Sequence, residues 1–162
     1  ANAAENIYEF YQIGSRAMDY KKAGQRIYIR LDKDDEVIAS LTSVCMKEGI
    51  QSAVFNGIGA CDKITVGTYI EEKHDFLDHK KEGMFEMTSL IGNVTTMKDG
   101  SLHTHAHAMF AYLDDDGEVK NFGGHLEWAR ICYTGEIVMD VTEGFVIGRK
   151  QDPQTGIEVW DL

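Results

Sequence analysis

Residues 26–49, RIYIRLDKDDEVIASLTSVCMKEG, contain the change of pattern that decides the fold. Hydrophobic and polar side chains alternate over residues 26–31, which predicts a β-strand because successive strand side chains point to opposite faces. The acidic run 32–35 favours the start of a helix, where the helix dipole attracts negative charge. From Glu36 to Glu48 the hydrophobic residues follow the spacing of an amphipathic helix, and Gly49 is suited to end it. The members of that hydrophobic stripe are Val37, Ile38, Leu41, Val44 and Cys45.

The rest of the chain is dominated by strand patterns. Residues 52–55 predict a short buried strand, residues 56–59 a turn or bulge, and residues 63–70 an alternating strand. The charged stretch 71–83 predicts a connection, and Asp-Asp-Asp-Gly at 114–117 predicts a hairpin turn. Further strands are predicted at 84–97, 102–113, 118–122, 126–133 and 136–141. We therefore predict an α+β fold in which a mostly antiparallel twisted sheet packs against one main helix.

Length and composition predict one domain. The chain has 162 residues, of which 43% are hydrophobic and 27% charged, close to the averages of globular proteins. Residues 1–25 form an N-terminal lead-in, and residues 26–162 form the domain. Cys45, Cys61 and Cys132 are too few and too widely spaced for a disulfide framework or a zinc knuckle, so they are expected to be buried free thiols.

The net charge narrows the classes of partner. The chain carries −11 at pH 7 with neutral histidines, which disfavours contact with DNA phosphates and with anionic membrane surfaces. Neither a bilayer-spanning run of about 18 apolar residues nor a signal-peptide core is found in the sequence. A cytoplasmic location and no membrane partner are the resulting expectations.

The segment Leu102-His103-Thr104-His105-Ala106-His107 carries the clearest chemical pattern. On a strand, His103, His105 and His107 project from the same face, with neighbours about 6.6 Å apart at Cα. Two adjacent imidazoles can therefore reach one metal ion, whereas the outer pair spans about 13 Å. A third ligand is expected from His125, which follows Gly123-Gly124 and begins the next strand region. The predicted metal ligands are thus His103, His105 and His125.

Three histidines without a fixed carboxylate are typical of an open site that keeps one position for water or a ligand. The expected cofactor is a divalent metal, with zinc as the first candidate. Glu127 and Glu136 are the carboxylates available as a base or as a partner of a ligating histidine. His107 is either such a partner or exposed at the strand edge. The other two histidines, His74 and His79, lie in the charged connection and are expected to be solvated.

Two other interpretations are weaker. A cupin-type site also begins with His-x-His on a strand, but it expects a glutamate a few residues later, where this chain has Ala108-Met109-Phe110-Ala111. The segment Gly57-Ile58-Gly59 resembles the start of a dinucleotide-binding loop. It lacks the third glycine and leads into a strand instead of a helix, which excludes that loop.

Taken in order, several segments resemble one known family, the plant and prokaryote conserved (PPC) domain. They are Tyr28 to Leu31, Asn56-Gly57-Ile58-Gly59-Ala60, Phe85 to Asn93, Leu102-His103-Thr104-His105, Gly123-Gly124-His125-Leu126 and Asp152-Pro153-Gln154-Thr155-Gly156. The resemblance covers about residues 26–162. It implies a sandwich-like fold with one main helix on a largely antiparallel sheet and, for prokaryotic members, a homotrimer. The family's histidine positions correspond to His103, His105 and His125.

Members of this family are often labelled candidate DNA-binding proteins with a PD1-like motif. Plant members hold DNA through an AT-hook before the domain and carry an arginine where this chain has Met84, and neither feature is found here. Three hypotheses therefore remain. The chain is a metal-dependent protein that binds or acts on a small molecule at a trimer interface, a DNA-binding or transcription-associated protein, or a trimeric interaction module with a structural metal.

Overall fold

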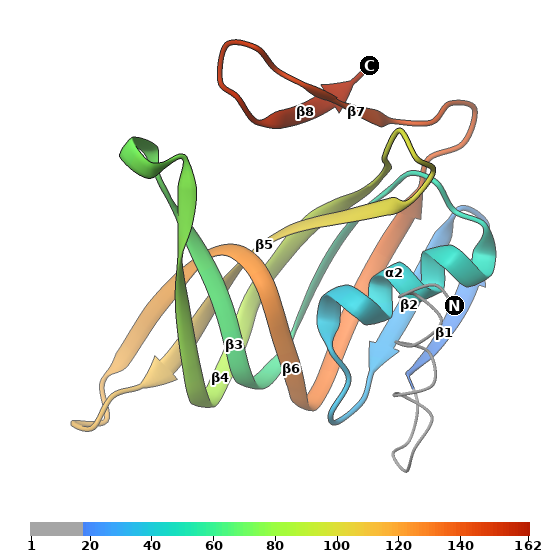
Figure 1. Cartoon of the computed structure of the whole chain (residues 1–162). Helices are drawn as coiled ribbons and strands as arrows, with labels where there is room; N and C mark the ends of the chain where they lie inside the picture. Colours follow the sequence, from blue (N-terminus) through green and yellow to red (C-terminus); the bar gives the residue numbers. More distant parts are fainter. Residues whose placement is uncertain (1–17) are drawn as a thin grey trace, which may run out of the picture.

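Figure 1 shows a computed structural model of the chain, in which residues 18–162 are described. One helix lies against a strongly curled sheet, and a small hairpin near the C-terminus stands over one end of the sheet. The elements are β1 Asp19–Ala23, β2 Arg26–Leu31, α2 Val37–Glu48, β3 Ala53–Ile70, the 3-10 turn η1 Glu71–Lys73, β4 Asp75–Thr96, β5 Leu102–Leu113, β6 Val119–Val141, β7 Gly148–Gln151 and β8 Glu158–Asp161. The predicted single domain with one main helix is confirmed.

The eight strands form one sheet whose middle closes on itself. The order is β1-β2-β6-β3-β4-β7-β8, and β5 pairs with both β4 and β6. Since β3 also pairs with β4 and β6, the four long strands form a closed ring of antiparallel pairings. The sheet is antiparallel apart from a single parallel pairing of β4 with β7. The ring places residues of β5 beside residues of β6, and this juxtaposition builds the site described below.

Helix α2 begins and ends as predicted. The Glu36 carboxylate caps its N-terminus by accepting hydrogen bonds from the backbone N–H of Ile38 and Ala39, and Gly49 ends it in the left-handed conformation at φ 66°. The stripe residues Val37, Leu41, Val44 and Cys45 are fully buried against the sheet. Within residues 18–162, no helix is long and apolar enough to cross a membrane.

The strands are longer than the sequence pattern predicts. Of the turn or bulge expected at 56–59, the structure has the bulge: β3 runs through these residues, and its register shifts between Gly57 and Gly59, and again between Cys61 and Lys63. β6 likewise joins three predicted strands into 23 residues. Bulges break the alternation of buried and exposed residues and bend a strand without ending it, so each bulge resembles a boundary in the sequence.

The prediction of a connection over residues 71–83 is wrong for most of that stretch. Only Glu71–Lys73 form a turn, and β4 already begins at Asp75. The first ten residues of β4 are exposed, so no buried face produces an alternating pattern there. Backbone pairing with residues 63–70 of β3 forms this strand instead. His74 and His79 are exposed, as predicted.

Two further elements differ from the sequence interpretation. Residues 19–23, part of the expected lead-in, form β1 and pair with β2, whereas residues 1–17 lie outside the described part of the chain. At the other end, β7 and β8 form a hairpin that no sequence pattern indicated. All three cysteines are free; Cys45 and Cys61 are buried, while Cys132 is only partly buried. Burial raises the pKa of both the Cys45 and Cys61 thiols to about 12.

Candidate metal centre

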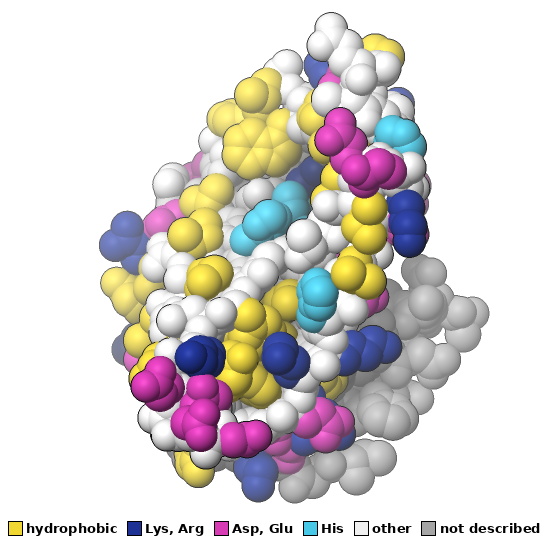
Figure 2. Space-filling view, turned by 90° about the vertical axis from the view of Figure 1, so that its left-hand side faces the viewer, with side chains coloured by type: hydrophobic (Ala, Val, Ile, Leu, Met, Phe, Trp, Pro, Cys, Tyr) yellow, Lys and Arg dark blue, Asp and Glu magenta, His cyan; other side chains and the backbone are white. Residues whose placement is uncertain are grey.

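Strand β5 presents its three histidines on one face. Ala106, Ala108 and Phe110 point into the core and are at most 4% exposed. The alternate residues His103, His105 and His107 therefore lie on the opposite, solvent-facing side of the strand. Figure 2 shows histidine side chains in a hollow of this face, between hydrophobic and acidic side chains.

The register between β5 and β6 adds the fourth histidine. His107 lies directly opposite His125 in the antiparallel pairing, so their side chains share one face. The ring centroids of His105 and His125 are 4.9 Å apart, those of His107 and His125 are 5.5 Å apart, and those of His105 and His107 are 5.3 Å apart. One ring nitrogen from each of these histidines lies within 4.8 Å of the others. His105, His107 and His125 thus form a compact three-nitrogen group, called the His cluster below.

The structure brings together a different trio from the one that the sequence predicts. His105 and His125 belong to both sets, but His107 takes the place expected for His103. The His103 ring lies 6.0 Å from that of His105, on the side away from His125, and is not part of the group. The predicted turn at 114–117 alone would place residue 107 opposite residue 124. In the structure the loop is one residue longer, because Leu113 pairs with Val119, and residue 107 therefore lies opposite residue 125. His103 would face a position beyond that hairpin pairing.

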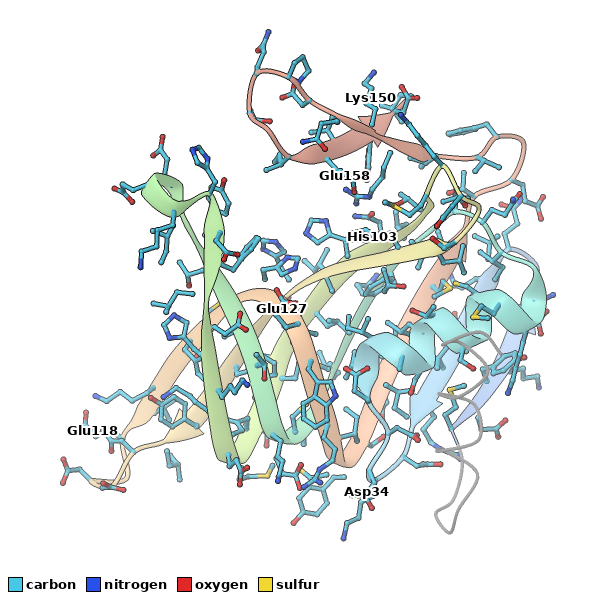
Figure 3. The ribbon with its side chains drawn as sticks, viewed as in Figure 1. Asp34, His103, Glu118, Glu127, Lys150 and Glu158 are labelled. Atoms are coloured by element: carbon cyan, nitrogen blue, oxygen red, sulfur yellow. The ribbon has the colours of Figure 1, made fainter. Side chains whose placement is uncertain are left out.

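One of the two candidate carboxylates adjoins the His cluster. Glu127 Oε1 lies 3.3 Å from His125 Nε2, so this carboxylate can fix the orientation of the ring. Figure 3 shows His103 on β5 and Glu127 on β6, both below the β7–β8 hairpin in this view. The other candidate, Glu136, lies on β6 opposite Arg30 of β2, in a hollow of the outer sheet face.

The β3–β4 hairpin forms one wall of the site. The Phe76 ring packs on the His125 ring with centroids 4.8 Å apart, and it also meets Tyr69 edge-on at 5.3 Å. A Cβ atom at Gly67 would come within 3.0 Å of the Phe76 ring, so a side chain there would crowd Phe76. This aromatic contact covers one side of the His125 imidazole.

The β7–β8 hairpin forms the opposite wall. Its Arg149 is only 7% exposed and donates through Nε to Thr95 Oγ1 at 2.9 Å. Arg149 Nη2 lies 3.4 Å from Asn93 Oδ1 and 3.5 Å from His105 Nδ1. Beside it, a groove of about 710 Å³ is lined by Val54, Ile91, Asn93, His105, His107, Trp160 and neighbouring backbone. The His cluster is therefore open to solvent along this groove.

Burial favours the neutral form of three histidines of the site. Burial, together with the neighbouring His125 and Arg149, lowers the pKa of His105 to about 4. Burial also lowers the pKa of His103 and of His125 below their ordinary range. Neutral imidazoles each offer a lone pair, which is the form that binds a divalent metal ion.

Acidification is expected to destabilise the metal-free protein through His105. Its pKa is about 4 in the folded state against 6.5 for an unperturbed histidine, so the unfolded state binds more protons between these values. The stabilising contribution is complete above pH about 6.5 and is lost as the pH falls towards 4. We expect a loss of about 2 kcal/mol in the free energy of unfolding, measured by urea denaturation at several pH values. A His105→Asn variant controls for the carboxylates: it should lose less stability than the wild type over this range, and parallel curves would contradict the assignment.

The donor set fits a divalent metal ion. Zinc and related ions bind neutral imidazole nitrogens in three-histidine sites that leave a further position open. The three nitrogens of the His cluster surround one point on an open face, and a carboxylate supports one ring. Together with the curled sheet and its single helix, this group defines a small α+β domain with a candidate metal centre.

The comparisons identify the family. The chain belongs to the Plants and Prokaryotes Conserved (PCC) domain family, whose profile matches residues 18–143. The expected resemblance is therefore confirmed. The family match begins one residue before β1 and ends two residues after β6, so the β7–β8 hairpin lies beyond it. A comparison with curated protein sequences finds no match.

Solved structures agree with this assignment. A plant- and prokaryote-conserved (PPC) protein of Pyrococcus horikoshii is 29% identical, with a TM-score of 0.73 over 93% of this chain and 98% of its own. A protein of Archaeoglobus fulgidus described as metal-containing is 27% identical, with a TM-score of 0.73 over 91% and 100% of the two chains. A candidate DNA-binding protein of Bacteroides thetaiotaomicron is 25% identical, with a TM-score of 0.79 over 90% and 98%.

Proposed function

We propose that this protein binds a divalent metal ion through His105, His107 and His125 and uses its open position to bind or act on a small molecule. The observation that carries the proposal is the convergence of three imidazoles on one exposed point. The metal-containing relative of Archaeoglobus fulgidus supports it. Zinc is the first candidate, because three neutral nitrogen ligands with an open position suit it well.

The chain's own residues suit such a site. A bound divalent ion would supply Lewis acidity at the open position. Glu127 holds the His125 ring and, at 40% side-chain exposure, can also accept a proton from a ligand in the groove. Phe76 excludes water from one face of His125. The groove beside Trp160 provides the space in which the ligand would lie.

Metal analysis of untagged protein tests the proposal. After removal of bound metal with a chelator and reloading with zinc, the wild type is expected to hold about one ion per chain. The triple variant His105→Ala/His107→Ala/His125→Ala should hold almost none. His74→Ala/His79→Ala removes two exposed histidines outside the cluster and is the matched control. Equal metal content in the wild type and the triple variant would overturn the proposal.

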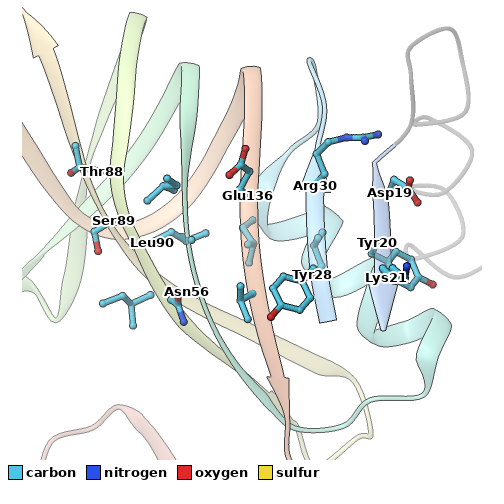
Figure 4. A pocket seen from close by; sticks show the side chains of 16 residues that line it. Asp19, Tyr20, Lys21, Tyr28, Arg30, Asn56, Thr88, Ser89, Leu90 and Glu136 are labelled. Atoms are coloured by element: carbon cyan, nitrogen blue, oxygen red, sulfur yellow. The ribbon is translucent and has the colours of Figure 1, made fainter. Parts of the chain in front are cut away.

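We further propose that the chain assembles as a homotrimer through the outer face of its sheet. Tyr28 and Ile58 expose 52% and 56% of their surface there, which is costly for a monomer in water. They border a hollow of about 900 Å³, whose labelled residues in Figure 4 include Arg30, Asn56 and Glu136. This hollow shares Asn56 and Ile91 with the groove of the His cluster, so a ligand would lie near the interface.

The trimer can be tested by light scattering after size-exclusion chromatography. The wild type is expected at about three times the 18.2 kDa of one chain. Ile58→Asp should shift the mass to that of a single chain, because a buried unpaired carboxylate is costly at an interface. Leu113→Asp, at a 67% exposed residue at the far end of β5, should leave the trimer intact. A monomeric wild type would refute this assembly.

The other two hypotheses make different predictions. DNA binding rests on the label of relatives, while the net charge of −11 opposes phosphate contacts. It predicts duplex binding at about 50 mM salt, where such contacts are strongest. A purely structural metal predicts that chelation lowers the melting temperature or dissociates the trimer without changing the binding of any small molecule.

A further inference from the structure

Arg149 differs from the other arginines of residues 18–162. Arg26, Arg30 and Arg130 each form an ion pair with an aspartate at 2.8–2.9 Å. Arg149 is the most buried of the four, yet no carboxylate oxygen lies within 4.0 Å of it in this part of the chain, and the charge of Glu158 acts on it only from a greater distance. A guanidinium taken out of water without an anion is expensive. The burial of Arg149 therefore favours an anionic ligand from outside the chain as its partner.

The polar contacts of Arg149 are all to neutral acceptors. Nε has a good hydrogen bond to Thr95 Oγ1 at 2.9 Å, and Nη1 lies 3.3 Å from the carbonyl oxygen of Glu158. Nη2 lies 3.4 Å from Asn93 Oδ1 and 3.5 Å from His105 Nδ1, both at the outer limit of hydrogen bonding. Nη1 has one acceptor for its two N–H groups and Nη2 has two acceptors at long distance, so both terminal nitrogens have capacity for a further acceptor. Nη2 adjoins the His cluster, since His105 belongs to that cluster.

The groove beside Nη2 is largely apolar. Val54, Ile91 and Trp160 are 44%, 63% and 41% exposed, and they line it together with Asn93, His105 and His107. Trp160 Nε1 lies 3.4 Å from Asn93 Oδ1, so β8 is connected to the same polar group as Arg149. A ligand that fits this groove needs an apolar body and one charged end near His105. The acidic side chains around the site, Glu127 and Asp78, and the single guanidinium of Arg149 favour a ligand with one negative charge over a ligand with several.

We propose that the small molecule bound at the His cluster is an organic carboxylate with an apolar body, and that Arg149 selects for its carboxylate. The guanidinium fork matches the geometry of a carboxylate and forms charge-assisted hydrogen bonds with it. The apolar body lies against Trp160 and Val54. This inference rests on the proposed metal function, because a divalent ion held by the His cluster would provide the second contact of the carboxylate. It goes beyond that function by assigning the chemical class of the ligand and the residue that recognises it.

Calorimetric titration with phenylacetate and phenylacetamide tests the proposal on protein of measured zinc content. The two probes share an apolar body and differ in the charged end. The zinc-loaded wild type is expected to bind phenylacetate at least about tenfold more tightly than the amide, as charge-assisted hydrogen bonds imply. Arg149→Gln should reduce this ratio by about tenfold while leaving zinc affinity within about threefold. Lys150→Gln, the same change at the adjacent exposed residue of β7, should leave the ratio unchanged.

The ratio of the affinities for phenylacetate and phenylacetamide distinguishes carboxylate recognition from structural damage, even where a variant loosens the β7–β8 hairpin. A general loss of the groove weakens both probes, whereas loss of carboxylate recognition weakens only phenylacetate. An unchanged ratio in Arg149→Gln, or no discrimination by the loaded wild type, overturns the inference and leaves the metal function standing. Tighter binding of inorganic phosphate than of phenylacetate also overturns it. A wild type that takes up no zinc overturns the metal function, and the inference falls with it.

Discussion

Replacing His107 by alanine is expected to lower the zinc affinity at least about a hundredfold, whereas His103→Ala should change it less than about threefold. His107 lies opposite His125, and its nitrogen belongs to the compact group, while His103 lies on the far side of His105. Loss of a residue that only supports a ligand typically costs 10–100-fold in metal affinity, so loss of a ligand should cost at least as much. The factor of a hundred corresponds to about 2.7 kcal/mol.

The two variants form a matched pair, since both remove a partly exposed imidazole from the same face of β5. Competition with a chromophoric chelator measures the affinity of each metal-reloaded protein. A larger effect at His103 than at His107 would favour the trio implied by the family resemblance over the one that the structure brings together. Equal and small effects at both would contradict a metal centre on this strand.

Gly92→Ala is expected to cost about 3 kcal/mol in the free energy of unfolding and to disturb the His cluster. Gly92 lies on β4 between Phe55 of β3 and Ala106 of β5. A Cβ atom built there would overlap the ring of Phe55 and the carbonyl oxygen of His105. Backbone atoms in a closed ring of strands have little freedom to move away, so the overlap must be relieved by distorting the sheet. Urea denaturation measures the loss.

Gly148→Ala is the control for this prediction. Its nearest Cβ contacts are 3.8 Å and 3.9 Å, ordinary van der Waals distances, so its stability should change by less than about 1 kcal/mol. If Gly92→Ala proved as stable as Gly148→Ala, the close approach of β3, β4 and β5 would not hold. Weakened zinc binding by Gly92→Ala would show that this approach also positions His105.

The sequence predicts helix α2 and the hairpin turn well because their signals are local. The hydrophobic stripe, the capping Glu36 and the terminal Gly49 all lie within 14 residues. The turn at 114–117 likewise needs only its own residues, and Gly117 adopts φ 78° as expected there. By contrast, the exposed half of β4 has no buried face. Its pairing with β3 depends on residues distant in the sequence, which no periodicity can reveal.

The site could be predicted only as far as the strand period allows. That period places His103, His105 and His107 on one face of β5 but does not choose between them. The choice depends on the β5–β6 register, which is set by the five-residue loop between Leu113 and Val119 and which brings His125 opposite His107. The two residues that flank the His cluster, Phe76 and Arg149, could not be predicted. Phe76 lies in a stretch that lacks a strand pattern, and Arg149 lies in a hairpin that pairs with β4 at one position only.

The pairing of β7 with β4 at a single position has an evolutionary consequence. The imidazoles sit on strands held from both sides, whereas the hairpin that carries Arg149 and Trp160 is joined to the sheet through Thr96 and Gly148 and a few side-chain contacts. Substitutions in the last fifteen residues can therefore change which ligand the groove binds while the strands that carry the three histidines keep their pairing. Related proteins could thus diversify what they recognise through a small C-terminal module while keeping the same ring of strands.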